Sequence, residues 1–575
     1  MINSQIILGI NTFHADSSAC LVINGKLIAA IEEERLNRIK HYAGFPLNAI
    51  KECLLIAKIK EKDITDIALN TKPFSNLIPK SFHYLKNLSF KGSISKKNFL
   101  RKKNIDKIFY EKLDLNKNVK FHFIEHHLAH ISSAFYPSGF DKANGLSIDG
   151  SGDFVTAAFA KCENNKILIK DKIFFPNSLG IFYHAMTQFL GFKNYGDEYK
   201  VMGLAAYGEP IFFDKISNNL FVNDKKNIIK LNLYYFNHHK KNFKYIVDEN
   251  LLIDQIYNLK LIELFEKDMK NENFKENFAC SVQKIYEHFF KKMINNLKKN
   301  NFSRNLVFSG GCALNSSANK IITSNNNSFE KVFINYAPGD NGGALGAAFV
   351  VAAKANFKIK GSQNPYVGSK YEDKYIRKIL ENDIYKDKFK YIFEPNEKKL
   401  NQITAKNISE GKVIGWFQGR MEFGPRALGN RSILADPRNP EMKNIINKKI
   451  KRRESFRPFA PSVLQKYQTQ WFEGNFNSPY MSSLAIVKKE QRNLIPAVTH
   501  FDNTARLQTV NQIDNLKFSN LIYEFYKITD VPILLNTSFN ENEPIVKKPE
   551  EALECILRTD MDLIVINNFI IEKKN

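Results

Sequence analysis

The chain has few cysteines and no long apolar run, and both absences exclude certain classes of protein. Its 575 residues include six cysteines, all isolated from one another, so no Cys-x-x-Cys pair is present. This spacing argues against a disulfide framework and against a zinc site built from cysteines. No stretch approaches the ~18 consecutive apolar residues of a membrane span. The N-terminus, MINSQIILGIN, lacks the basic segment of a signal peptide, so we expect a cytoplasmic protein.

The chain has fewer acidic than basic residues, and the resulting positive charge indicates which kinds of partner it could bind. The chain has 84 Lys and Arg against 59 Asp and Glu, a net charge of +25. Such a charge favours anionic partners: phosphates, nucleic acid or anionic lipid. The excess is mostly Lys in a chain also rich in Asn and Ile, a bias that A- and T-rich codons produce by themselves. We favour this compositional explanation over nucleic-acid binding.

The length and composition indicate several folded domains. A single core stops growing near ~250–300 residues, so two domains or more are expected. The 47 Phe and 23 Tyr exclude disorder as the main state. The sequence becomes polar and charged after about residue 356. We expect an α/β protein with a first domain over 1–355, a connector over 356–390 and a second domain over 391–575.

A pattern of strand, polar turn and hairpin occurs twice in the first domain. The first copy comprises residues 6–11, 12–16, 18–23 and 26–31, with the hairpin around Asn24-Gly25. The second comprises residues 145–148, 149–153, 154–160 and 167–175. This recurrence predicts a duplicated α/β unit whose two polar turns face a common cleft. An apolar stripe predicts a helix over 279–297, and further strands are expected at 306–309, 332–335, 412–417, 531–535 and 562–571.

Histidines are concentrated at one point, in Glu125-His126-His127-Leu128-Ala129-His130. His126 and His130 are four residues apart, so on a helix they project from one face, and neutral imidazoles in that arrangement suit a divalent transition metal. The alternative is a pair of helix-surface histidines. Carboxylates at strand ends are the natural partners, and Asp149 and Asp340 are candidates because each follows a predicted strand.

Three glycine-rich turns each follow a strand in the first domain. Together they predict a nucleotide or phosphate cleft, because glycine lets backbone N–H groups approach phosphate closely. Each turn alone could be only a tight turn. The candidate residues are Gly150, Gly152, Gly310, Gly311, Asn315, Gly342 and Gly343. His14, in the first polar turn, would face the same cleft as a general base, or would be a turn histidine making one hydrogen bond.

The second domain carries a dense basic region. Arg426 in Gly-Pro-Arg and Arg457 in Phe-Arg-Pro are held by a stiff backbone, which favours a preorganised anion site over a solvated surface. The run around Lys448–Arg453 could be plain surface charge. The segment Asn536-Thr537-Ser538-Phe539-Asn540 follows a predicted strand, and as a turn it could hold phosphate or a small amide.

The ordered set of motifs resembles a known family. It comprises ILGIN…HADSSACLV, EEERLNRIKH, HHLAH, IDGSGD, GDEYKVMGLAAYG, SGGCALN, YAPGDNGGALGAA, GRMEFGPRALGNRSI, KRRESFRPFAP and LLNTSFN. In this order it resembles the NodU/CmcH family of O-carbamoyltransferases, from about residue 6 to the C-terminus. GPRALGNRSI with FRPFAP is highly specific, whereas the glycine turns are not.

The resemblance implies an N-terminal actin-like (ASKHA) domain and a C-terminal YrdC-like domain. In the family, the second converts carbamoyl phosphate and ATP, which Mg(II) accompanies, into carbamoyl-adenylate, and the first passes the carbamoyl group to a hydroxyl. By motif, His126, His130, Asp149 and Asp340 would hold a metal such as Fe(II). Carbamoyl phosphate and ATP phosphates would be bound by Arg426, Lys451, Arg457 and Ser538, with Asn536 and Asn540 in the same motif. His14 would lie near the acceptor hydroxyl, and Glu198 and Lys200 on the acceptor side.

Two rival functions remain open at this point. Threonylcarbamoyl transfer to tRNA uses the same two folds, and the positive charge supports it, but dispersed Lys is not the strip of basic and stacking residues that RNA binding favours. A non-catalytic nucleotide-binding protein is the other. We expect a small-molecule or glycan acceptor of unknown identity; the oligomeric state is open, a homodimer included. Residues 221–245, with His238-His239, match no motif and could help to select the acceptor.

Overall fold

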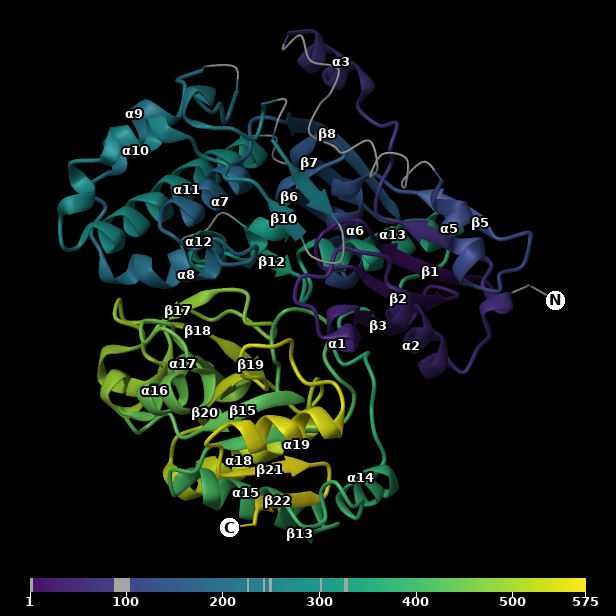
Figure 1. The fold of residues 1–575 in the computed structure, drawn as a ribbon, viewed down its shortest axis with the longest axis vertical. Helices are drawn as coiled ribbons and strands as arrows, with labels where there is room; N and C mark the ends of the chain where they lie inside the picture. The colour runs from purple at the N-terminus through teal and green to yellow at the C-terminus, as the bar shows by residue number, and fades with distance from the viewer. Residues whose placement is uncertain are drawn as a thin grey trace. The chain divides into compact units, whose positions relative to one another are not determined.

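The computed structural model describes residues 4–86, 104–224, 227–240, 243–247, 251–299, 302–324 and 329–574. The chain divides into two compact units. Unit 1 comprises Met1–Ile322 with Asn326–Gln363, and unit 2 comprises Asn364–Asn575 with Thr323–Asn325. Both combine helices with sheets, as the α/β prediction required (Figure 1). Over the described residues, none of the helices has both the length and the apolar character needed to cross a bilayer.

Unit 1 contains two five-stranded sheets of the same design. The first has the order β3-β2-β1-β4-β5, and its strands are β1 (Ile6–Asn11), β2 (Ser18–Ile23), β3 (Lys26–Glu32), β4 (Asp66–Leu69) and β5 (Lys120–Phe123). The second has the order β12-β11-β6-β7-β8, and its strands are β6 (Lys142–Gly152), β7 (Val155–Glu163), β8 (Lys166–Phe174), β11 (Asn305–Ser309) and β12 (Lys331–Ile334). In each, the leading strand forms an antiparallel hairpin on one side and pairs in parallel on the other. The duplicated unit expected from the sequence is therefore present.

Equivalent helices follow the last strand of each sheet and pack together. These are α6 (His126–Ser138) and α13 (Asp340–Lys354). Their close approach depends on Gly346, because a Cβ there would lie 1.8 Å from the Ala129 carbonyl oxygen. Ser132 Oγ donates a hydrogen bond to the Gly346 carbonyl at 2.9 Å. This contact brings the start of α6 and the start of α13 toward the same place.

The other helices of unit 1 cover the sheets or form an insertion between β8 and β11. The first group is α1 (Glu34–Asn37), α2 (Leu47–Ala57), α3 (Leu77–Lys86) and α5 (Ile105–Lys112). The insertion contains α7 (Leu179–Phe189), α8 (Glu198–Leu204), α9 (Phe213–Leu220), α10 (Leu259–Phe265), α11 (Phe274–Lys299) and the strand pair β9 (Tyr245–Val247) and β10 (Leu251–Ile253); α12 (Ser316–Thr323) lies between β11 and β12. The long helix α11 is the one that the apolar stripe predicted over 279–297, and its buried face includes Val282, Ile285 and Phe289.

Unit 2 is built on an eight-stranded mixed sheet with the order β13-β22-β21-β14-β15-β20-β16-β19. The strands are β13 (Phe389–Phe393), β14 (Ile414–Phe417), β15 (Arg431–Ala435), β16 (Ala460–Leu464), β19 (Gln508–Val510), β20 (Ile533–Ser538), β21 (Leu563–Ile566) and β22 (Phe569–Lys573); β17 (Leu484–Ile486) pairs with β18 (Thr504–Arg506). The helices are α14 (Asp373–Leu380), α15 (Glu397–Ser409), α16 (Met442–Ile445), α17 (Gln468–Trp471), α18 (Leu516–Thr529) and α19 (Pro549–Arg558). Trp416 and Phe525 are fully buried in the core.

Two expectations for the second half differ from the structure. Much of the segment expected as a connector, 356–390, is ordered in unit 2, because α14 buries Ile376, Ile379 and Leu380 in the core and the following β13 pairs with β22. The segment 536–540 does not begin as a turn: β20 runs on to Ser538 because Asn536 and Ser538 pair with Leu434 and Ser432 of β15.

Candidate functional site

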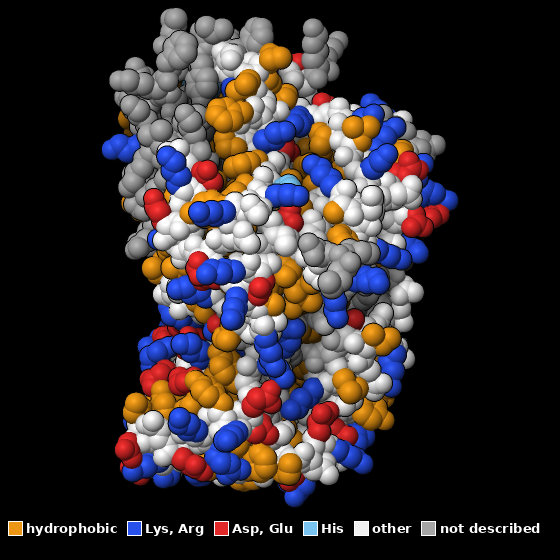
Figure 2. Space-filling model, turned by 90° about the vertical axis from the view of Figure 1, so that its right-hand side faces the viewer, with side chains coloured by type: hydrophobic (Ala, Val, Ile, Leu, Met, Phe, Trp, Pro, Cys, Tyr) orange, Lys and Arg blue, Asp and Glu red, His pale blue; other side chains and the backbone are white. Residues whose placement is uncertain are grey.

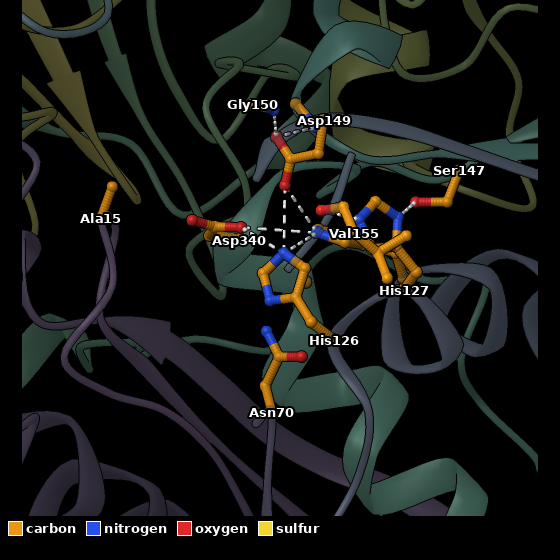
Figure 3. Close-up of polar contacts among 12 residues, drawn as sticks. Ala15, Asn70, His126, His127, Ser147, Asp149, Gly150, Val155 and Asp340 are labelled. Carbon is orange, nitrogen blue, oxygen red and sulfur yellow. Dashed lines mark hydrogen bonds and ion pairs between the residues drawn. The ribbon is translucent and has the colours of Figure 1, made fainter. Parts of the chain in front are cut away.

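The four residues expected to bind metal lie together in unit 1 (Figure 3). His126 and His130 come from the first turns of α6, Asp149 from the far half of β6, and Asp340 from the start of α13. Asp149 Oδ2 lies 3.1 Å from the Nε2 atom of each histidine, and Asp340 Oδ1 lies 3.4 Å from each. The two Nε2 atoms are 3.0 Å apart. Two carboxylates and two imidazoles thus point at one common centre.

The spacing and charge of this cluster fit a divalent metal ion. Ligand atoms about 2.0–2.2 Å from a shared ion, at angles of about 90–110°, lie about 2.8–3.6 Å apart, which matches the distances above. Both imidazoles are almost fully buried, and their Nε2 atoms face each other. Two negative carboxylates beside two neutral imidazoles would be compensated by one doubly charged ion. The mixed nitrogen and oxygen set suits Fe(II), Mn(II) or Zn(II).

The electrostatics of the protein alone lead to the same conclusion. Burial by itself would lower the pKa of His126, but hydrogen bonds with Asp149 and Asp340 raise it well above its ordinary value. Burial would raise the pKa of Asp149, but the two histidines hold it well below its ordinary value. The carboxylates therefore stabilise positive charge at the Nε2 atoms, in the place where an ion would supply it.

Neighbouring residues hold the ligands in position. Asp149 Oδ1 accepts hydrogen bonds from the backbone N–H groups of Gly150 at 2.8 Å and Gly311 at 3.2 Å. Asp153 Oδ2 accepts from the His126 backbone N–H at 3.0 Å, which anchors the start of α6. A Cβ on Gly152 would lie 2.0 Å from His126 Cδ2, so the absent side chain makes room for the ring.

His127 has a separate, structural environment. Its Nδ1 lies 2.9 Å from Ser147 Oγ and its Nε2 lies 2.9 Å from the Val155 carbonyl oxygen. Burial, with His126 and His130 nearby, lowers its pKa to about 3, so the ring is neutral. This agrees with the choice of His126 rather than His127 as the partner of His130.

His14 reaches this site from the turn after β1. It is buried, and its ring centroid lies 5.2 Å from that of His126. The turn is held by Asn11, whose amide donates to the carbonyl oxygens of Ala15 at 2.9 Å and Asp16 at 3.1 Å. Both polar turns of the duplicated unit thus reach His126, one through His14 and the other through Asp149, and the role of His14 as a base stays a prediction.

The glycine turns are used mainly to build the site. The N–H groups of Gly150 and Gly311 go to Asp149, that of Gly310 goes to the Pro338 carbonyl at 2.8 Å, and that of Gly342 goes to the Gly339 carbonyl at 3.0 Å. A Cβ on Gly343 would lie 1.8 Å from Asn70 Nδ2. Asn315 accepts from the Ala318 N–H in the first turn of α12 and donates to Gln283. Their N–H groups thus have protein partners, and phosphate binding by these residues stays a prediction.

The residues expected on the acceptor side are engaged within the insertion. Glu198 hydrogen-bonds His184 Nδ1, and although burial would raise its pKa, His184 lowers it. Lys200 forms an ion pair with Asp197 at 3.1 Å and lies over the Phe192 ring. Their contact with an acceptor stays a prediction.

Unit 2 contains a cationic site around Lys451. This side chain is buried, and its ammonium group donates to the Ser538 carbonyl at 2.5 Å and to the Asn540 carbonyl and Oδ1, both at 2.7 Å. Ser538 Oγ also donates to Asn540 Oδ1 at 2.7 Å. Burial, with Arg453 and Arg457 nearby, lowers the pKa of Lys451 well below its ordinary value. The Asn536 side-chain amide donates hydrogen bonds to Ser462 Oγ, Gln508 Oε1 and the Ala427 carbonyl oxygen, which hold this part of β20 in place.

The structure adds two arginines that the motifs did not single out. Arg506, at the end of β18, has a buried Nε that finds no hydrogen-bond partner among the described residues. Burial lowers its pKa well below the ordinary value, and Arg426, Arg453 and Arg457 lower it further. Plain surface charge was one interpretation of Arg453, but its Nε donates to Asn447 Oδ1 at 2.7 Å. Nothing in the sequence around Arg506, FDNTARLQ, marks it, because its neighbours lie elsewhere in the chain. Such a concentration of cations is stabilised by a bound polyanion.

Comparisons with known proteins agree with this arrangement. The family models Carbamoyltransferase N-terminus and Carbamoyltransferase C-terminus match residues 6–349 and 405–573. An uncharacterized protein of Synechocystis sp. is 36% identical over 99% of this chain and 96% of its own length. The nodulation proteins NolNO of Sinorhizobium fredii and NolO of Bradyrhizobium diazoefficiens are each 35% identical, over 98% and 78% of this chain and 80% and 79% of their own.

Among solved structures, HypF of T. kodakarensis matches with a TM-score of 0.31 and 14% identity, over 62% of this chain and 48% of HypF. A likeness of this size carries no conclusion about ligands. The two family models cover most of the chain, and the relatives span it nearly end to end, which confirms the resemblance drawn from the motifs. The protein belongs to the carbamoyltransferase family, with the nodulation proteins NolNO, NolO and U among its relatives, and it is a carbamoyltransferase.

Proposed function

We propose that the protein is an ATP-dependent O-carbamoyltransferase that acts on a sugar-containing acceptor. Unit 2, as a YrdC-like domain, would hydrolyse carbamoyl phosphate to carbamate and phosphate, and the carbamate would attack the α-phosphate of ATP to give carbamoyl-adenylate and pyrophosphate. Unit 1, as an actin-like (ASKHA) domain, would transfer the carbamoyl group to an acceptor hydroxyl. The catalytic domains would follow the expected division at 1–355 and 391–575, extended in unit 2 by the ordered part of 356–390.

The cationic site of unit 2 is the observation that carries this proposal. Lys451 donates its hydrogen bonds to neutral oxygens of Ser538 and Asn540. Arg453 and Arg457 lie near Lys451, and the same two arginines with Arg426 lie near Arg506. Burying so much positive charge is costly unless anions are bound. Carbamoyl phosphate and the triphosphate of ATP, which would bring Mg(II), supply charge of the required sign. Arg426 and Arg457 would bind phosphate oxygens through their planar guanidinium groups.

In unit 1, the residues around the metal centre would carry out the transfer. A metal bound by His126, His130, Asp149 and Asp340, which we propose to be Fe(II), would polarise the carbamoyl carbonyl and hold the phosphate of the adenylate. His14 would take the proton from the acceptor hydroxyl, which is a weak nucleophile without a base. The buried setting of the cluster would keep water from a mixed anhydride that water destroys.

The test of the proposed activity is pyrophosphate–ATP exchange with and without carbamoyl phosphate. We expect exchange that requires carbamoyl phosphate, is lost in Arg426→Ala and is retained in Lys449→Ala, because Lys449 is an exposed residue of the same basic region. Exchange that instead requires threonine and bicarbonate would refute this function and indicate threonylcarbamoyl transfer to tRNA. The dispersal of Lys and Arg over the face drawn in Figure 2 supports the small acceptor.

A further inference from the structure

Four aromatic side chains from separate segments of unit 1 lie together. They are His83 of α3, Phe154 of the turn between β6 and β7, Phe175 just after β8, and His238. The ring centroids of His83 lie 5.7 Å from Phe154 and 5.5 Å from Phe175, and Phe175 lies 5.5 Å from His238. Figure 1 shows α3 above β7 and β8 in this view. His238 belongs to the segment that no motif explained.

The turn that carries Phe154 is hydrogen-bonded to the first residue of α6 through the preceding residue, Asp153. Asp153, adjacent to Phe154, accepts the His126 N–H at 3.0 Å and also the Lys72 N–H at 2.8 Å, just before α3. Asp153 and Phe154 both have left-handed backbone conformations, with φ of 50° and 72°. Non-glycine residues adopt this conformation at a cost, and it recurs at functional sites. Here it lets one turn present Asp153 to α6 and Phe154 to His83.

The cluster also contains a buried acceptor that no group of the described residues satisfies. His238 Nε2 donates to the Pro176 carbonyl at 3.0 Å. Burial lowers the pKa of His238 to about 4, so the ring is neutral and its Nδ1 keeps a lone pair. That Nδ1 atom is buried without a hydrogen-bond partner, as is Nδ1 of His239. A buried acceptor left unpaired is costly, whereas a ligand hydroxyl would satisfy it.

We propose that the aromatic cluster of His83, Phe154, Phe175 and His238 is an acceptor subsite that binds a saccharide ring. The C–H face of a sugar would pack on the rings of Phe154, Phe175 and His83, which are only partly buried. A sugar hydroxyl would donate to His238 Nδ1. An aliphatic chain has no hydroxyl to donate to this acceptor. The inference rests on the proposed function, since it names the acceptor class for the same transfer site.

The test is saturation-transfer-difference NMR of the full-length protein with D-glucose, D-galactose, D-mannose, L-rhamnose and N-acetyl-D-glucosamine, one at a time. We expect at least one sugar to bind, and to bind about tenfold more weakly to Phe175→Leu and His238→Gln. Phe175→Leu removes the ring but keeps apolar bulk, which protects folding. Tyr110→Ala, an exposed aromatic on α5, should bind like the wild type. Binding that is unchanged in both cluster variants, or absent for all five sugars, overturns the proposal.

Failure of this inference is distinguishable from failure of the proposed function. Pyrophosphate–ATP exchange depends on residues of unit 2, so Phe175→Leu and His238→Gln should retain it. If the wild type shows exchange but neither variant loses sugar binding, the subsite is refuted and the activity stands. If the wild type binds a sugar through the cluster but shows no exchange, the adenylate chemistry is refuted and the subsite stands.

Discussion

Replacing Gly152 by alanine should disable the metal centre while leaving the fold intact. An alanine Cβ would lie 2.0 Å from Cδ2 and 2.2 Å from Cγ of His126, whereas ordinary Cβ contacts begin at 3.4 Å. The ring must therefore retreat by about 1.4 Å, several times the ~0.2 Å by which metal–ligand distances vary. His126 Nε2 would leave the group of atoms that lie 3.0–3.4 Å apart around the common centre.

We expect the affinity for a divalent ion to fall by about 10–100-fold, which is typical when a residue that positions a metal-ligating side chain is replaced. The assay is competition between apo-protein and a chromophoric chelator for Mn(II) and Zn(II), with thermal unfolding as the check on folding. Gly150→Ala is the matched control, because a Cβ there meets nothing within 4 Å. Equal metal affinity in Gly152→Ala and Gly150→Ala would refute the assignment of His126 as a ligand.

Three further outcomes follow from named contacts. Lys451→Met should abolish pyrophosphate–ATP exchange while Lys449→Met retains it, and exchange in both variants would contradict a binding role for the buried ammonium. Burial would lower the pKa of His41, but Asp16 raises it to about 9, so this pair should stabilise the fold fully below pH ~6.5 and lose its effect as the pH rises through about 9. The melting temperature of His41→Gln should therefore fall less than that of the wild type between pH 7 and 9.5, and parallel curves would disprove the coupling. His127→Phe should lower the free energy of unfolding by about 1–3 kcal/mol in urea without loss of bound metal, because it leaves two buried groups unpaired; metal loss would show that His127 is a ligand.

Local signals were sufficient for the elements whose partners are near in sequence. The hairpin of β2 and β3 lies where Asn24-Gly25 predicted it, because turn chemistry and alternating burial act over a few residues. The long helix α11 follows from its apolar stripe for the same reason. The recurrence of this local pattern was enough to predict a duplicated unit.

Contacts between segments that are far apart in the sequence could not be predicted from local signals. The segment before β13 was expected to be a connector because most of its residues are polar or charged. Three apolar side chains of α14 nevertheless pack into the core of unit 2. Arg506 gains its significance only from Arg426, Arg453 and Arg457, which lie about 50–80 residues earlier in the chain. The glycines were expected to expose N–H groups to phosphate, but their spacing could not reveal that Asp149 and the Pro338 carbonyl accept those hydrogen bonds.

The sequence by itself determined the family and the repeated arrangement, since each depends on residue identity or on short-range spacing. Only the tertiary structure decided that His126, His130, Asp149 and Asp340 point at one centre, and that Gly152 makes room for them. It also decided that His83 and His238, 155 residues apart, belong to one aromatic cluster. The physical reason is that convergence depends on how sheets and helices pack, and close packing is set by distant parts of the chain together.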